Sequence, residues 1–236
     1  KIADYLIKPV NPNQILLAIK KIIDQKRLVS EKTTSDYQVA FGKIGLQIGD
    51  SLTYTDWVNV YKKLVYWEME LETSSSSEMD EVLHMQKQDA NNAFFKFIKN
   101  KYLDWLDPKL GEKPLLSPSI IKEKVIPSLE NNEKVVFVLI DNLRFDQWYL
   151  LKPILQDYYK VEREELYFSI LPTATQFSRN AIFAGLMPSE IEKLNPDLWQ
   201  DSEDEGSLNA FEEELLKKQF TRLGYTKRFF FEKILN

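Results

Sequence analysis

Apolar positions divide the chain into two parts with different periodicities. In the first part they recur at the spacing of amphipathic helices. Helices are predicted after Pro12 and over residues 36–48, 53–71 and 78–106. Thr53 and Asp56 form a capping-box pattern that marks one helix start. We expect the last three helices to pack as a small bundle, and the polar stretch 30–35 to be a linker.

In the second part, strand-like and helical segments alternate. The apolar run Val135–Ile140 has no polar alternation, as expected of a parallel strand buried on both faces. Shorter strand-like runs occur at 165–170 and 227–231. Helices are predicted over 117–129, 144–158 with an interruption at Pro153, 175–184, 189–194 and 207–223. Such alternation predicts a parallel, doubly wound α/β sheet.

Two polar residues stand where ligands bind in sheets of this kind. Asp141 follows the apolar run, and a carboxylate at the carboxyl end of a strand is placed to hold a metal ion. Thr175, 34 positions later, is expected near a helix start, where the helix dipole favours a phosphoryl group. A zinc, magnesium or manganese ion would lower the pKa of the threonine hydroxyl and activate it as a nucleophile. The alternative is that Asp141 begins a turn and Thr175 caps a helix.

Composition narrows the classes of function. With 236 residues, of which 44% are hydrophobic, the chain can bury a sizeable core in one large or two modest domains. It has no cysteine, which excludes disulfides and thiolate metal sites. A formal net charge of -5 argues against a protein that coats duplex nucleic acid, so a nucleotide substrate is expected to be small. No apolar segment is long enough for membrane insertion, and we expect a cytoplasmic location.

The first residues carry one resemblance to a known family. Tyr5–Val10 is a short strand-like run that ends near Lys8 and Pro9, and Asn11 and Pro12 begin a helix. This βα unit resembles the last unit of a two-component receiver domain. The resemblance implies that Lys8 contacts a phosphorylated aspartate that lies upstream of this chain. Without the resemblance, Lys8 is an ordinary surface lysine.

Motifs in the second part carry another resemblance. The segments Val138–Arg144, Pro172–Thr175 and Ala184–Pro188 resemble a PglZ domain of the alkaline phosphatase superfamily. The order of receiver end, helical bundle and such a domain resembles PorX-type response regulators. In the superfamily a strand-end aspartate and a helix-start hydroxyl residue share a metal ion. The resemblance therefore implies that Asp141 is a metal ligand and that Thr175 is both a ligand and the nucleophile.

Spacing selects between two neighbouring threonines. A Gly-Leu-x-Pro motif begins ten residues after Thr175, as in nucleotide phosphodiesterases of the superfamily, so Thr175 is preferred to Thr173. Those enzymes often carry an asparagine three residues after the nucleophile to stabilise phosphate oxygens. Ser178 stands at that place here. Phosphate stabilisation is therefore assigned to Ser178, to Arg179, or to neither.

Other residues of the expected site are less settled. Asn142 is a candidate substrate-binding residue, and Asn142, Arg144 and Asp146 either support the metal site or belong to an ion pair at a helix start. The family's remaining Asp and His ligands lie beyond the nucleophile, and this chain has no histidine after His84. We therefore expect a fragment in which the two-metal site is incomplete.

The resemblances imply three domains. These are the receiver end at 1–28, a helical-bundle linker at 29–110, and the N-terminal part of an alkaline-phosphatase-like domain at 111–236. They imply a response regulator of type IX secretion whose effector is a phosphodiesterase on small or cyclic oligonucleotides, with two zinc or manganese ions in the full-length protein. Implied partners are a sensor histidine kinase, a sigma factor, a component of the secretion motor and a second copy of the chain. The rival prediction is a non-catalytic signalling adaptor that binds such partners.

Overall fold

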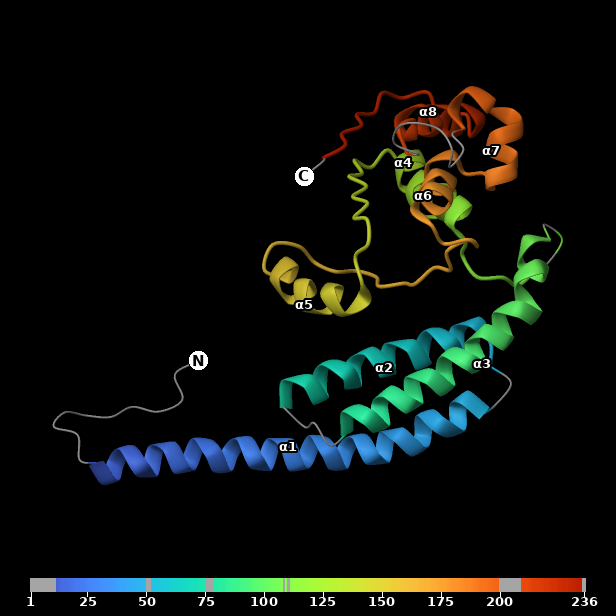
Figure 1. The fold of residues 1–236 in the computed structure, drawn as a ribbon. Helices are drawn as coiled ribbons and strands as arrows, with labels where there is room; N and C mark the ends of the chain where they lie inside the picture. The colour runs from blue at the N-terminus through green and yellow to red at the C-terminus, as the bar shows by residue number, and fades with distance from the viewer. Residues whose placement is uncertain are drawn as a thin grey trace. The chain divides into compact units, whose positions relative to one another are not determined.

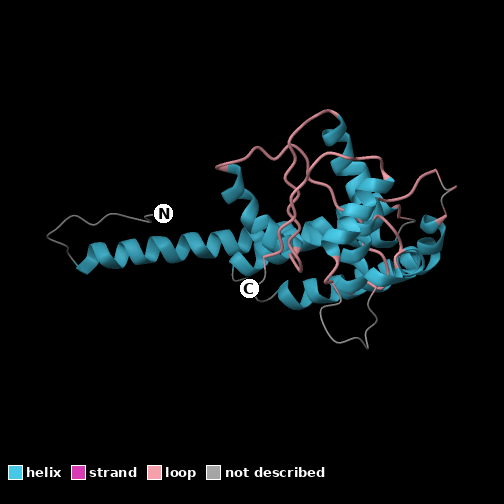
Figure 2. Ribbon diagram, turned by 90° about the horizontal axis from the view of Figure 1, so that it is seen from above, coloured by secondary structure: helices cyan, strands magenta, loops and turns pink. Residues whose placement is uncertain are grey.

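The structure is a computed structural model that describes residues 12–49, 52–74, 79–107, 109, 111–199 and 209–234. In these residues helices are joined by turns and extended segments (Figure 2). The chain divides into two compact units. The first unit contains the described residues up to Glu112 together with Arg144–Lys160, and the second contains Lys113–Leu143 and the described residues from Val161 onward. Lys8 and the strand predicted around it lie outside the described residues.

Three helices pack side by side in the first unit (Figure 1). They are α1 (Pro12–Gly49), α2 (Tyr54–Ser74) and α3 (Asp80–Leu106). The linker predicted at 30–35 is wrong, because α1 runs through it without a break. That stretch is polar but contains neither glycine nor proline, and Arg27 and Glu31 form an ion pair across one helical turn with an Nε–Oε1 distance of 3.6 Å.

The three helices share an apolar core. Its buried members are Tyr37, Ile44, Trp57, Val60, Leu64, Leu71, Leu83 and Ala90. One polar pair lies among them: the Tyr37 hydroxyl donates to Oε1 of Gln86 at 3.2 Å, and Nε2 of Gln86 donates to the carbonyl of Phe41 at 2.9 Å. The capping box predicted at Thr53 is present, because its amide and hydroxyl both donate to Oδ2 of Asp56, at 3.0 and 2.7 Å. The Asp56 amide donates back to the Thr53 hydroxyl.

Helix α5 (Phe145–Gln156) belongs to the first unit and packs against α2. The Phe145 ring lies 5.9 Å from the Tyr61 ring, and the Lys62 ammonium lies 5.7 Å from the centre of the same Phe145 ring. The predicted interruption at Pro153 is wrong, since the helix continues through it. A proline removes only one N–H donor, and the exposed surface of α5 lets water satisfy the freed carbonyl.

The helices of the second unit are shorter. A 3₁₀ turn (η2, Ser117–Ser119), a π-helical turn (η3, Ile121–Val125) and α4 (Ile126–Glu130) follow one another. Further along come α6 (Thr175–Ala184), α7 (Pro188–Leu194), a 3₁₀ turn (η4, Pro196–Leu198) and α8 (Glu212–Arg222). The buried core of this unit consists of Ile121, Val125, Ile126, Ile182, Phe183, Ala184, Ile191, Leu215, Leu216 and Phe220. Helices α6 and α8 therefore supply most of the core.

The predicted parallel, doubly wound α/β sheet is wrong, because no strand forms among the residues that the structure describes. The run Val135–Ile140 lacks helical structure, but the side chains of Val136 and Val138 are 87% and 70% exposed. Apolar, β-branched composition favours an extended backbone, whereas a strand also needs a neighbour that accepts its hydrogen bonds. The described part of the chain offers an isolated parallel bridge instead, between Leu116 and Phe168.

The predicted strand at 227–231 is also an extended segment rather than part of a sheet. Alternate side chains of this segment still point to opposite sides: Phe229 and Phe231 pack on the core, and Phe230 is 83% exposed. The Phe229 ring lies 4.9 Å from Phe220, and the Phe231 ring lies 5.7 Å from Phe183. The two-residue period therefore predicts which side chains are buried, although no strand pairs with this segment in the described residues.

Close contacts hold the end of α6 against α8. Gly185 ends α6 in the left-handed conformation, with a φ of 61°. The Arg222 guanidinium donates to the carbonyl of Ala184, the last residue of α6. Burial lowers the pKa of Arg222. Since α6 carries Thr175 at its other end, these contacts fix the helix that presents the candidate nucleophile.

Candidate functional site

Thr175 is the first residue of α6, and its side chain is exposed. The N-cap position is occupied by Ala174, which has no side chain able to cap, so Thr175 does not have the capping role considered as its alternative. The hydroxyl of Ser178 donates to the carbonyls of Thr173 and Ala174, both at 3.3 Å. The first amides of a helix are not used in its internal hydrogen bonds, so the start of α6 is positively polarised around Thr175.

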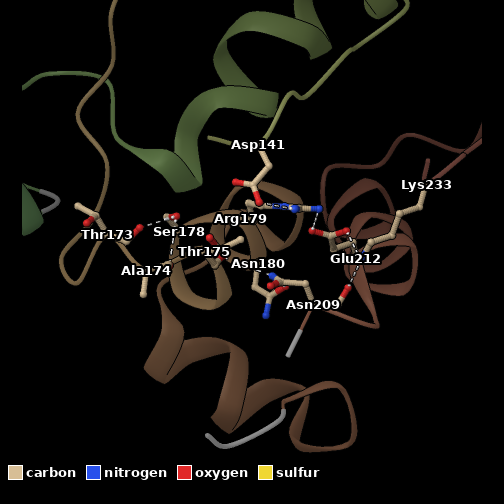
Figure 3. Close-up of polar contacts among 10 residues, drawn as sticks. All are labelled: Asp141, Thr173, Ala174, Thr175, Ser178, Arg179, Asn180, Asn209, Glu212 and Lys233. Carbon is tan, nitrogen blue, oxygen red and sulfur yellow. Dashed lines mark hydrogen bonds and ion pairs between the residues drawn. The ribbon is translucent and has the colours of Figure 1, made fainter. Parts of the chain in front are cut away.

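Asp141, in the turn that follows the apolar run at 135–140, contacts α6. Its carboxylate oxygen Oδ2 accepts a hydrogen bond of 3.1 Å from Nη1 of Arg179 (Figure 3). Arg179 lies four residues after Thr175, so the two side chains occupy one face of α6. The structure thus brings Asp141 to the helix face of Thr175, across 34 positions of sequence.

A buried carboxylate holds the other side of the same guanidinium. Glu212, the first residue of α8, is 1% exposed. Its Oε1 lies 2.6 Å from Nη2 of Arg179, and its Oε2 lies 3.0 Å from Nζ of Lys233. Neither oxygen accepts a hydrogen bond of good geometry, so both contacts are ion pairs by distance alone. Asp141, Arg179, Glu212 and Lys233 form a row of alternating charges, which we call the charged row (Figure 3).

An asparagine pair supports the start of α6. Nδ2 of Asn209 donates to Oδ1 of Asn180 at 3.0 Å and lies 3.4 Å from the carbonyl oxygen of Thr175. The ammonium of Lys233 donates to the carbonyl of Asn209 at 2.7 Å. Lys233 therefore links this pair to the charged row, and Asn209 contacts the first two turns of α6.

Sequence reasoning did not find Glu212, Lys233 or Asn209. For Glu212 the sequence does contain a signal. Residues three and four positions after it are Leu215 and Leu216, so Glu212 lies on the apolar face of α8. A carboxylate on such a face is buried and requires a cation. No pattern in the sequence identifies the cation, because Arg179 and Lys233 belong to other segments of the sequence than α8.

The described residues do not by themselves fit a metal site. They contain no group of three or more His, Asp or Glu side chains placed to hold one ion. The Asp141 carboxylate, the expected ligand, faces the Arg179 guanidinium. A guanidinium carries a fixed positive charge, so it competes with a metal ion for this carboxylate.

The other predicted residues lie on separate segments of the chain. Asn142 is exposed in a turn, with a left-handed φ of 56°. Arg144 and Asp146 form an ion pair at the start of α5, with an Nη2–Oδ2 distance of 2.8 Å, which is the second of the two roles predicted for them. The hydrogen bond from Arg144 lowers the pKa of Asp146. His84 is exposed on α3, 3.2 Å from the amide of Gln88.

Two family models match the chain. The PorX response regulator linker domain matches residues 27–106, which cover most of α1 and all of α2 and α3. The BREX system PglZ alkaline phosphatase-like domain matches residues 120–234. The chain has the PorX-type architecture. Its response regulator linker domain is followed by an alkaline phosphatase-like PglZ domain, and the second of these contains Asp141, Thr175 and the whole charged row. No curated protein matches the chain.

The comparisons and the fold divide the chain differently at one element. Helix α5 lies within the residues that match the PglZ model, yet it packs against α2 in the first compact unit.

Among the described helices, none is both long enough and apolar enough to cross a lipid bilayer.

Proposed function

We propose that this chain is part of a response regulator whose PglZ domain hydrolyses phosphodiester bonds in small or cyclic oligonucleotides. The match to an alkaline phosphatase-like domain supports this class of reaction. The observation that carries the proposal is the 3.1 Å contact between Arg179 and Asp141, which brings a carboxylate to the helix face of Thr175. Asp141 thus contacts the helix that begins with Thr175, although the two residues lie 34 positions apart in the sequence.

In the proposed reaction, Oγ1 of Thr175 gives up its proton and forms a bond to phosphorus, while the bond from phosphorus to one ester oxygen breaks and that oxygen takes up a proton and leaves as an alcohol. Water then hydrolyses the bond between Thr175 and phosphorus, which restores the threonine hydroxyl and releases a phosphomonoester. The positive end of α6 and the Arg179 guanidinium stabilise the negative charge on the phosphoryl oxygens. Two zinc or manganese ions, when bound in the natural protein, would activate the threonine hydroxyl; the described residues do not assemble their ligands.

Regulation is proposed to come from a receiver domain. Lys8 would contact the phosphorylated aspartate of that domain, a sensor histidine kinase would supply the phosphoryl group, and the protein would act in the cytoplasm on type IX secretion. The match to a response regulator linker domain supports this arrangement. Phosphorylation would control dimerisation or access of substrate to the Thr175 site.

The test is hydrolysis of nitrophenyl phosphodiesters and cyclic oligonucleotides by the natural protein, with zinc or manganese added. We expect Thr175→Ala and Asp141→Ala to abolish hydrolysis. Thr173→Ala is the matched control, because Thr173 lies two residues away and contacts Ser178 through its backbone carbonyl, which the substitution keeps. Equal rates in the wild type and the two site variants would contradict the proposal.

One observation favours a second candidate, a non-catalytic adaptor that binds a sigma factor or a secretion-motor component. The Asp141 carboxylate is already paired with Arg179, and Arg179 is anchored on the buried Glu212. A residue held in this way is suited to a structural role. If Thr175→Ala leaves secretion intact in cells while substitutions on the surface of the helical bundle abolish it, the adaptor is the better account.

A further inference from the structure

Glu212 is buried in a way that its neighbours are not. It is 1% exposed, whereas the side chain of the next residue, Glu213, is 41% exposed and pairs with Lys217 at 2.7 Å. Burying a carboxylate is costly unless cations compensate it. Each carboxylate oxygen of Glu212 has a cation beside it: Arg179 at Oε1 and Lys233 at Oε2. Because Glu212 would be buried without compensation if Arg179 moved away, the ion pair holds the Arg179 guanidinium in place.

The two ends of the Arg179 guanidinium differ. Nη2 meets a fully buried carboxylate at 2.6 Å, and Nη1 meets the Asp141 side chain, which is 48% exposed, at 3.1 Å. Ion pairs with an exposed partner are weak and exchange readily with water or other anions, while breaking a buried pair leaves an uncompensated charge. Nη2 thus anchors Arg179 to Glu212, whereas the partner of Nη1 can be exchanged for another anion.

The exchangeable nitrogen lies on the helix face of Thr175. Arg179 is one turn along α6 from Thr175, and the amides at the start of this helix favour an anion. A guanidinium fork is suited to binding a phosphoryl group with one nitrogen while the other stays on a carboxylate. Asp141 is then the partner that an incoming anion replaces.

We propose that Glu212 is a positioning residue, which holds Arg179 so that its outer nitrogen binds a phosphoryl oxygen of a substrate at Thr175. This inference rests on the proposed phosphodiesterase function for its substrate class. Lys233 neutralises the second oxygen of Glu212, so the carboxylate anchors Arg179 without adding an unpaired negative charge near the phosphoryl group. Glu212 acts through Arg179 and does not touch the substrate.

The test measures binding of inorganic phosphate to the chain by calorimetry, which requires no turnover. Glu212→Gln is expected to weaken phosphate binding about tenfold, because a neutral amide holds the Arg179 guanidinium less firmly than the buried carboxylate does. The matched control is Glu213→Gln, which removes the same charge from the adjacent residue. Loss of a negative charge should by itself strengthen the binding of phosphate. Weaker phosphate binding in Glu212→Gln but not in Glu213→Gln would therefore be the opposite of a simple charge effect.

A second variant keeps the test decisive if Glu212→Gln does not fold. Arg179→Lys retains the positive charge, but an ammonium cannot hold Glu212 and a phosphoryl oxygen in one planar fork. We expect about tenfold weaker phosphate binding and, with phosphodiester substrates, a higher KM. Unchanged phosphate binding in both variants, or no binding to the wild type, would overturn the inference.

The outcomes also separate this inference from the proposed function. If phosphate binding depends on Glu212 but the protein hydrolyses no phosphodiester, the positioning role of Glu212 is supported and the proposed phosphodiesterase function is contradicted. If hydrolysis requires Thr175 but KM is the same in the wild type and Glu212→Gln, the phosphodiesterase function is supported and the positioning role of Glu212 is contradicted.

Discussion

The hydroxyl of Tyr37 in α1 donates a hydrogen bond of 3.2 Å to Oε1 of Gln86 in α3. Tyr37 is fully buried and Gln86 is 3% exposed. The Gln86 amide also donates to the carbonyl of Phe41, so one side chain joins two turns of α1 to α3. This pair fixes the register between the first and third helices of the bundle, because a shift of either helix would leave buried polar atoms without partners.

The first prediction concerns pH. Burial raises the pKa of Tyr37 from 10.0 to about 12. The unfolded chain therefore loses the phenol proton at lower pH than the folded chain does, and the free energy of unfolding should fall as pH rises from 10 to 12. Urea unfolding followed by circular dichroism across this range measures the fall. Tyr37→Phe should make the fall smaller, and the raised pKa values of Tyr61, Tyr66 and Tyr167 account for the remainder. An equal fall in wild type and variant would contradict the assignment to Tyr37.

The second prediction concerns the end of α6. Gly185 has a φ of 61°, and a Cβ added there would overlap the Gln219 side chain, with 2.7 Å to its Cδ. Gly185→Ala should lower the free energy of unfolding by about 2–4 kcal/mol, from backbone strain and overpacking together. Gly224→Ala is the control for strain alone, since φ is 74° but the space is open, and should cost about 1 kcal/mol. Chemical denaturation compares them; equal losses would exclude a clash with Gln219.

The third prediction concerns the attachment of α5 to α2. Phe145 contacts the Tyr61 ring and the Lys62 ammonium. Phe145→Ala removes both contacts, and amide hydrogen exchange in α5 should become at least about tenfold faster. Tyr158→Ala is the control, because Tyr158 follows α5 and is 79% exposed. If exchange in α5 is insensitive to Phe145→Ala, this aromatic contact does not hold the helix.

The fourth prediction concerns the second cation of the charged row. Lys233→Met leaves Glu212 buried with one cation instead of two, which should cost about 3 kcal/mol of stability. Lys217→Met is the control, because Lys217 pairs with the half-exposed Glu213 and its removal should change stability little. Thermal unfolding of the two variants decides the matter. Similar melting temperatures would show that Glu212 does not need Lys233.

Much of the first unit could be predicted from the sequence. The capping box at Thr53 was found because its residues interact within one helical turn. The helices over α2 and α3 followed from apolar periodicity. Residues 30–35 are helical despite their polar composition, because the exposed surface of a helix is polar as well and composition alone does not separate it from a linker.

The second unit was predicted less well, because a sheet depends on partners that local sequence does not specify. Val135–Ile140 has strand-like composition, but composition determines only the backbone's preference. At the candidate site, Asp141 and Thr175 were found as single residues with favourable positions. The charged row was not, because its contacts join α6, α8 and the C-terminal extended segment, which share no sequence pattern.

The central claim is that Thr175 at the start of α6 is a nucleophile toward phosphodiesters. The most direct measurement is mass spectrometry of the natural protein, quenched during turnover of a nitrophenyl phosphodiester with zinc or manganese present. The account predicts, on the peptide that contains Thr175, a phosphoryl ester that still carries the substrate's second alcohol group, assigned to that residue by fragmentation and absent in Thr175→Ala. A phosphoryl ester on Thr173 or Ser178 instead, or turnover that persists in Thr175→Ala, would contradict it.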